Sequence, residues 1–449
     1  MARPESTAVD DWPIEQVREH EDWKDPLADW PPPQAQGEML MEMVKATLEK
    51  RDRGEPLSRI ERTLCVGTNN NADRIPTYSF FTDGPANTYG HTCREVERDS
   101  VLHAEVVERW TEDYGFEALG EGIDTMNSEI EAMGLVRMKF QPNAPGDIKI
   151  RLMDDMDDDH ALGFWEEAAE RYNPFTDGRL PRRIELYDLL VENMYKKRGW
   201  PVMAAPSSTF AQTVNAIGFK RAVGWMREKP ENFHRAIQAQ LKANIKWFRA
   251  LKSRGVTFMI AIDAWNSVPN FRPDQLFEFE KPYIKPLIDS VAPTPVIYFY
   301  WGLRLCGEPT PEWKPGDRDG QGGWIEFLER SAETGTFVVT NLAPDYYTPP
   351  SDDLQLYRET ANRLGKSYIT GLKDEVLLSG TIPEIRAEVR RVIKGLYPCT
   401  GGCIIVPNMV PMGTPDQNIH AYVQALEEYG TYPIDLERIE ADDRADARV

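Results

Sequence analysis

Short apolar runs recur along the second half of the chain, and amphipathic stretches separate them. The runs lie at residues 201–205, 256–263, 294–302, 334–341, 367–371 and 402–407. Their β-branched and aromatic residues are typical of short buried strands. Two further strands are predicted earlier in the chain, one at 74–81 and one within 135–140 or 147–153.

The stretches between these runs carry the period of helices. Within residues 231–255, for example, Phe233, Ile237, Leu241 and Phe248 fall near one helical face. Strands separated by single helices predict βα units and a parallel sheet. Six later and two earlier strands give the count of a TIM (β/α)8 barrel, so we predict an α/β fold of this type. A doubly wound sheet is the alternative, but the Gly-rich turn expected after its first strand is missing.

The last predicted unit is a strand, a loop and a helix. Residues 403–406 form the strand, and the helix is expected to start with Thr414 as its N-cap, Pro415 in the first turn and Gln417 completing a capping box. In a barrel, the loop between them lies at the C-terminal ends of the strands, where barrel enzymes carry out their chemistry.

The predicted organisation is an N-terminal arm, one barrel domain and an acidic C-terminal tail, at residues 1–38, 39–434 and 435–449. The arm is rich in Pro, Asp and Glu, and such a segment rarely folds alone. It contains three tryptophans, Trp12, Trp23 and Trp30. These indicate that the arm lies on the main body or on a second subunit, as in a homodimer. Ordered structure is expected to begin near Met39 and to stop near Ile434.

The formal net charge of −21 argues against nucleic-acid binding, because neutralising phosphates requires clustered Lys and Arg. The negative charge also argues against binding to anionic membranes. No apolar run approaches the ~20 residues that span a bilayer. Five cysteines in 449 residues form no disulfide framework, so we expect a cytoplasmic protein. The acidic run at 153–160 lacks the spacing and the central Gly of a calcium loop, and we interpret it as a solvated loop.

The last unit resembles the uroporphyrinogen decarboxylase (URO-D) superfamily in its "GG" before the strand, its "TP" at the helix start, Asn418 and "EEYG". Four other segments resemble the same superfamily in matching order: "SRIERTL…ADRIPTY" (58–78), "ENFHRAIQ" (231–238), "PYIKPLID" (282–289) and "ITGLKDEVLLSGT" (369–381). The resemblance covers roughly residues 40–434 and implies a TIM barrel, in agreement with the periodicity.

The resemblance implies one of two chemistries. The decarboxylases of the superfamily bind a polycarboxylate porphyrinogen through an arginine-bearing loop after the first strand, and they carry a His in the last loop. This chain has no Arg or Lys between Arg74 and Arg94 and no His between His234 and His420. Since bidentate carboxylate capture requires Arg, both departures count against a true uroporphyrinogen decarboxylase.

The other branch comprises the corrinoid-linked methyltransferases, many of which bind zinc to activate a thiol acceptor. The resemblance places their zinc ligands at Phe299, Trp301 and Met409 of this sequence. Neither Phe nor Trp can bind zinc, and Met is a poor substitute. We therefore expect no metal and no zinc-activated thiol.

Without the metal, these positions and Asn408 offer an aromatic and thioether surface with one amide. Such a surface suits a planar ring, although the same side chains would also serve to fill an enlarged core. Asp263 ends a predicted strand and is expected either to bind a ring N–H or act as a general acid, or else to cap a helix or form a salt bridge. Asp374 matches an acidic residue of the superfamily, although the Asn expected before it has become Leu372. Two further polar candidates are Asn341 and Asn127.

We therefore predict a zinc-independent methyltransferase with Asp263 and Asp374 as catalytic residues. The resemblance implies methyl transfer between a corrinoid (cobalamin), carried by a partner protein, and a small non-thiol substrate, with tetrahydrofolate favoured. The alternatives are a decarboxylase of a carboxylated tetrapyrrole and a non-catalytic barrel that binds a corrinoid or a partner.

Overall fold

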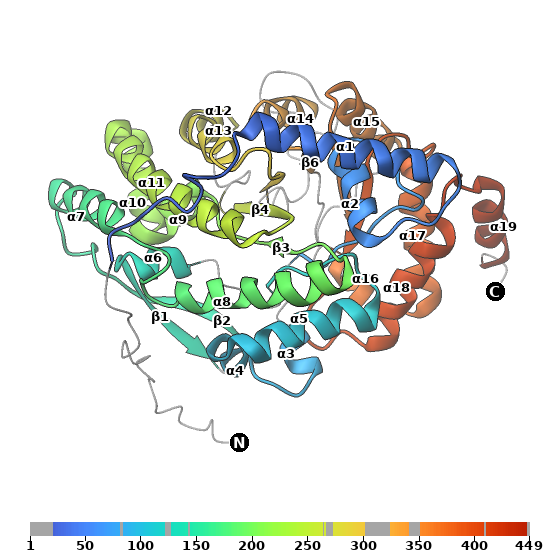
Figure 1. Ribbon diagram of the computed structural model, residues 1–449, viewed down its shortest axis with the longest axis horizontal. Helices are drawn as coiled ribbons and strands as arrows, with labels where there is room; N and C mark the ends of the chain where they lie inside the picture. Colours follow the sequence, from blue (N-terminus) through green and yellow to red (C-terminus); the bar gives the residue numbers. More distant parts are fainter. Residues whose placement is uncertain are drawn as a thin grey trace.

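The parallel strands lie at the centre of the molecule and the helices around them, as Figure 1 shows for β3, β4 and β6. The computed structural model describes residues 21–80, 84–121, 127–141, 144–263, 265, 273–300, 324–340, 351–407 and 410–446. The strands are β1 (Val136–Gln141), β2 (Ala144–Arg151), β3 (Met203–Ala204), β4 (Phe258–Asp263), β5 (Val296–Tyr300), β6 (Val338–Thr340), β7 (Ser367–Leu372) and β8 (Cys403–Pro407).

The helices of the first half are α1 (Pro33–Asp52), α2 (Arg59–Gly67), α3 (Gly84–Thr88), α4 (Cys93–Arg98), α5 (Ser100–Tyr114), α6 (Ser128–Ala132), α7 (Asp158–Arg171), α8 (Leu180–Leu190), the π-helix η1 (Val191–Lys196), α9 (Thr209–Ile217) and α10 (Phe219–Glu228). Those of the second half are α11 (Pro230–Arg254), α12 (Pro273–Phe279), α13 (Lys281–Asp289), α14 (Trp324–Ala332), α15 (Ser351–Arg363), α16 (Asp374–Ser379), α17 (Ile382–Leu396), α18 (Asp416–Tyr429) and α19 (Leu436–Asp446). None of the helices in the described ranges is both long enough and apolar enough to cross a lipid bilayer.

Parallel pairing confirms the predicted α/β class. The strands form two parallel sheets of order β3-β4-β5 and β6-β7-β8. The amide of Phe337 donates to the carbonyl of Val296 over 3.4 Å and brings the two sheets together. Closure of the strands into an eight-stranded barrel stays a prediction.

The segments predicted for the second strand are strands, but their predicted place among the parallel strands is wrong. Both candidate segments form the antiparallel hairpin β1–β2, which stands apart from the parallel sheets. Residues 117–120 instead pair with the extended segment 74–80, through the amide of Ser79 and the carbonyl of Ala118 at 3.0 Å. Alternating polar and apolar residues in the hairpin suit an antiparallel strand pair with one solvent-exposed face, whereas a central parallel strand is buried on both faces.

Alternate strand residues pack in a separate inner cluster. In β4 these are Phe258, Ile260 and Ile262, whereas Met259 and Ala261 join the larger cluster beneath the helices. Every parallel strand contributes to the inner cluster: Met203 from β3, Ile297 from β5, Val338 from β6, Ile369 from β7, and Ile404 and Val406 from β8. Tyr78, Phe80 and Ala118 join it from the two earlier segments. The period-two alternation of strands thus separates an inner face from a helix-covered face.

The last unit was predicted correctly in type but not in its cap. Strand β8 covers the expected residues, and α18 follows it. However, the residue before the helix is Pro415, which makes no side-chain cap. The hydroxyl of Thr414 donates instead to the carbonyl of Pro411 over 2.7 Å, because it closes the turn before the helix. The predicted capping box of Thr414 and Gln417 is therefore wrong.

The described part of the N-terminal arm lies on the main body, as one of the two predicted arrangements has it. Trp23 stacks on Phe175 with ring centroids 5.8 Å apart. Asp25 pairs with Arg249 of α11 at 2.5 Å. The first helix begins at Pro33, before the predicted start of order, and Trp12 lies outside the described residues.

The expectation that structure stops near Ile434 is wrong, because α19 follows it and packs on α17. Arg390 of α17 is only 2% exposed and pairs with Asp443 at 2.7 Å and Asp446 at 2.5 Å. A composition that suggested a solvated tail thus supplies the carboxylates that a buried guanidinium requires.

Candidate functional site

Asp263 ends β4 with its side chain on the helix-covered face, in step with Met259 and Ala261. Its side chain is fully buried. The hydroxyls of Ser208 and Tyr298 donate to Oδ2 over 2.5 and 3.4 Å. Asp263 is therefore a buried, hydrogen-bonded carboxylate, and the side chain that caps the neighbouring helix is that of Ser208.

Ser208 links this carboxylate to the start of α9. Its Oγ accepts the amide of Ala211 over 3.1 Å, so it caps the helix while it donates to Asp263. A hydroxyl can do both at once because it has one donor and two acceptor sites. The end of β4 and the beginning of α9 are therefore held as one unit.

A series of hydrogen bonds joins Asp263 to Asn127, two residues that the sequence pattern indicated separately as candidate site residues. The amide of Trp265 donates to Asp263 Oδ1 over 2.9 Å, and its indole N–H donates to Asn215 Oδ1 over 2.6 Å. The side-chain amide of Asn215 then donates to Asn127 Oδ1 over 2.8 Å. The chain fixes an indole and two amides beside the C-terminal ends of β4 and of segment 117–120.

The exposed ring of Phe219 lies against this series of hydrogen-bonded residues. Phe219, the first residue of α10, stacks on Trp265 with centroids 5.2 Å apart and planes inclined by 27°. Arg151 donates through Nε to the carbonyl of Asn215 over 2.8 Å. Gly218 joins α9 to α10 at a φ of +80°, where an added Cβ would also come within 3.4 Å of Arg151. No motif in the sequence pointed to Asn215, Phe219 or Arg151.

A buried charge cluster supports the end of segment 117–120. Arg183 of α8 donates to the Glu121 carboxylate and to the Ser128 hydroxyl, and Tyr187 also donates to Glu121. Glu129 lies 3.9 Å from the Arg183 guanidinium. Burial raises the pKa of Glu129 to about 7, and Arg183 opposes the shift. Because Ser128 follows Asn127 directly, this cluster fixes the backbone from which Asn127 projects.

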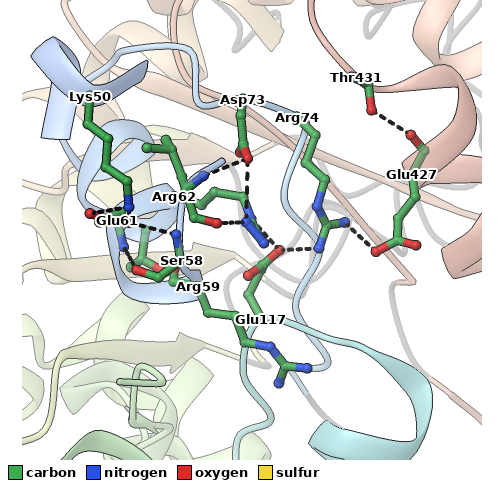
Figure 2. A network of polar contacts seen from close by, with 12 residues as sticks. Lys50, Ser58, Arg59, Glu61, Arg62, Asp73, Arg74, Glu117, Glu427 and Thr431 are labelled. Atoms are coloured by element: carbon green, nitrogen blue, oxygen red, sulfur yellow. Dashed lines mark hydrogen bonds and ion pairs between the residues drawn. The ribbon is translucent and has the colours of Figure 1, made fainter. Parts of the chain in front are cut away.

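A second ionic network lies at the opposite, N-terminal ends of the strands (Figure 2). Arg62 and Arg74 pair with the buried carboxylate of Glu117 at 3.1 and 3.0 Å, and Arg74 also pairs with Glu427 at 3.2 Å. Burial lowers the pKa of Arg59 in this network to about 10. The network joins α2, the start of segment 74–80, Glu117 and α18, and so holds these elements together.

The acidic run at 153–160 has protein partners. Asp157 caps α7, and Asp158 pairs with Arg221 at 2.9 Å and with Lys229 at 2.6 Å. Hydrogen bonding, first to Lys229, lowers the pKa of Asp158 to about 2. The run is a turn and a helix start, tied to α10 and α11, rather than a wholly solvated loop.

The other predicted site residues lie elsewhere or outside the description. Asp374 is buried at the first position of α16. This helix follows β7, which belongs to the other parallel sheet than β4. Phe299 pairs with Ile262 in the strand ladder, but its side chain is outside the described part. The remaining predicted residues outside the described part are Trp301, Asn341, Asn408 and Met409.

The described cysteines do not belong to this site. Cys65, Cys93, Cys399 and Cys403 are buried, and burial raises the pKa of Cys65 to about 11. In the described residues, no three His, Cys, Asp or Glu side chains converge as a metal site requires. The expected loss of zinc concerns positions whose side chains are not described, so it stays a prediction.

Comparisons with known proteins agree on the family. The family model described as "Uroporphyrinogen decarboxylase (URO-D)" matches residues 58–429. A uroporphyrinogen decarboxylase from Thermodesulfovibrio yellowstonii is 35% identical over 71 residues, which are 16% of this chain and 20% of that protein. The chain thus spans only a fifth of this curated relative in the match.

A solved structure, described as a methyltransferase from Methanosarcina mazei, superposes with a TM-score of 0.64. The superposition covers 83% of this chain and 99% of that one at 16% identity. At this identity the likeness shows a shared fold.

Proposed function

This chain belongs to the uroporphyrinogen decarboxylase family, and from that premise we propose that it is a methyltransferase of the corrinoid-linked branch of the superfamily. It would move a methyl group between a corrinoid carried by a partner protein and a non-thiol substrate, with tetrahydrofolate favoured. The fold shared with the Methanosarcina mazei methyltransferase supports this branch.

The observation that carries the proposal is the hydrogen-bonded chain from Asp263 through Trp265 and Asn215 to Asn127. It presents fixed amides and an indole at the strand ends, and these groups suit the edge and face of a planar conjugated ring. Neither a thiol nor an ammonium group takes part in the chain. Its chemistry fits a tetrahydropterin or the amide-bearing rim of a corrin better than a polycarboxylate.

The work of such an enzyme is positioning, because methyl transfer is an in-line displacement at carbon. The corrinoid, when bound, supplies the cobalt–carbon bond at which the methyl group is exchanged. Asn215 holds the Trp265 indole in one orientation, and Asp263 holds the Trp265 backbone. We assign Asp263 the role of a positioning residue, since its carboxylate is buried and both oxygens accept hydrogen bonds.

The remaining predicted site residues stay in the proposal. Asp374 would supply a proton at the substrate nitrogen, the role of a general acid. Phe299, Trp301, Asn341, Asn408 and Met409 would line the ring site from the other strand ends.

A visible-absorption assay tests this function. The protein is mixed with methylcobalamin or cob(I)alamin, and the corrinoid spectrum is followed with and without tetrahydrofolate or methyltetrahydrofolate. Methyl transfer that depends on the folate compound is the expected result. Because the family also contains decarboxylases, a parallel incubation with uroporphyrinogen measures CO₂ release. Decarboxylation without methyl transfer would replace the proposal.

A further inference from the structure

We propose that Phe219, Trp265 and Arg151 form a binding subsite for a planar heteroaromatic ring that carries a carboxylate tail. The inference rests on the proposed function for the class of ring, and it adds the residues that hold the ring and its tail. The subsite lies beside the end of β4, on the side of the α9–α10 corner.

The ring-binding part is an exposed aromatic pair. Phe219 is 39% exposed although it is a large apolar residue, and its ring lies 5.2 Å from that of Trp265. An exposed phenyl ring is unremarkable alone, but here its partner indole is anchored at the backbone by Asp263 and at the N–H by Asn215. A ligand ring stacked on this pair would meet a surface that is already ordered, so little conformational entropy is lost on binding.

The short corner between the helices makes the arrangement stiff. Gly218 is at once the C-cap of α9 and the N-cap of α10. Its φ of +80° allows the chain to turn within one residue. Asn215, which orients the indole, and Phe219, which stacks on it, are thus held on either side of one rigid corner.

Arg151 supplies the charge for the tail. Its Nε donates to the carbonyl of Asn215 over 2.8 Å, which places the guanidinium at the same corner. Arg221 of α10 pairs with a carboxylate at 2.9 Å, whereas in the described part of the chain no carboxylate pairs with Arg151. In a protein of net charge −21, a guanidinium with no acidic partner among the described residues is a favourable place for an anionic group.

Binding measurements with two probes test the subsite. Calorimetric titration uses methyltetrahydrofolate, which has a ring and a carboxylate tail, and methyltetrahydropterin, which has the ring alone. We expect Phe219→Ala to weaken both probes by about tenfold, the scale of one aromatic contact. Arg151→Gln should weaken methyltetrahydrofolate by about five- to tenfold and leave methyltetrahydropterin unchanged, because only the first carries the charge that Arg recognises.

Matched controls lie at the other end of the strands and on the outer surface. Tyr397 is also 39% exposed but precedes β8, so Tyr397→Ala should leave both affinities unchanged. Arg254, which pairs with Asp188 at 3.5 Å, provides Arg254→Gln as the charge control. Thermal melting checks that each variant is folded.

The outcomes separate this inference from the proposed function. The subsite is overturned if wild type binds neither probe, if Phe219→Ala binds both normally, or if Tyr397→Ala is equally impaired. If the probes bind as expected but no methyl group moves to or from a corrinoid, the function fails and the subsite stands. If methyl transfer occurs and Phe219→Ala leaves its KM for methyltetrahydrofolate unchanged, the function stands and the subsite fails.

Discussion

Asp263 accepts the backbone N–H of Trp265 over 2.9 Å, and through this bond the last residue of a buried strand sets the position of a loop indole. We expect Asp263→Asn to raise the KM for the ring-bearing substrate by about tenfold and to change kcat by less, since the loss concerns ligand positioning. Steady-state kinetics across pH make the check. A proton-transfer role would instead lower kcat by ~10²–10⁴ and remove one limb of the pH profile.

The buried Glu129 predicts a pH-dependent stability. Its pKa is about 7 in the folded protein against 4.5 for a free side chain, so the folded state retains a proton that the unfolded state has released between these values. The free energy of unfolding should therefore fall as pH rises from about 4.5 to 7, by about 3 kcal/mol if this group acted alone.

Glu129→Gln tests this expectation, because a neutral amide cannot titrate. Urea unfolding at pH 5 and pH 8 should show the variant gaining stability relative to wild type at the higher pH. Glu384→Gln is the control, since hydrogen bonds from Thr381 lower the pKa of that exposed carboxylate. Parallel pH curves for wild type and Glu129→Gln would show that Glu129 is ionised throughout.

Removing α19 should destabilise the protein despite its acidic composition. Truncation after Asp435 deletes both carboxylates that pair with Arg390 and the buried side chain of Ile439, a combined loss of about 2–4 kcal/mol. Denaturant unfolding measures it, with truncation after Asp446 as the control. Arg390→Met in the shortened chain should recover part of the loss, and a shortened chain as stable as the full one would contradict the role of the helix.

Metal analysis checks the expected zinc independence. With Phe299, Trp301 and Met409 at the three ligand positions, the purified protein should contain far less than one zinc per chain, and chelators should leave methyl transfer intact. One tightly bound zinc per chain would show that the assignment of these positions is wrong.

Continuous apolar runs made the central strands predictable. Strands β4, β7 and β8 are buried along their whole length, and in β4 and β8 the sequence shows this as a nearly continuous apolar run. Residues 117–120 carry no such run, with Glu117 and Gly120 within them, and their strand character comes from pairing with 74–80. Tertiary pairing of this kind leaves no local signal.

The candidate site also has one part that could be predicted from the sequence and another that could not. Asp263 was predictable because a polar residue directly after a buried strand marks the end at which barrels place their chemistry. Its contact with Ser208, which makes it a positioning residue rather than an open catalytic carboxylate, depends on where α9 begins. Asn215 and Phe219 sit on helices, and only the corner at Gly218 brings them to Trp265.

The one-residue corner at Gly218 also constrains how this protein can evolve. Adding or removing a single residue there would rotate one helix against the other by about 100° and carry Phe219 away from Trp265. Substitutions at Phe219 can change the aromatic surface that it forms with Trp265, whereas insertions or deletions at the corner would separate the two rings. In descendants of this chain, insertions and deletions should accumulate in other connections and spare the interval from Asn215 to Phe219.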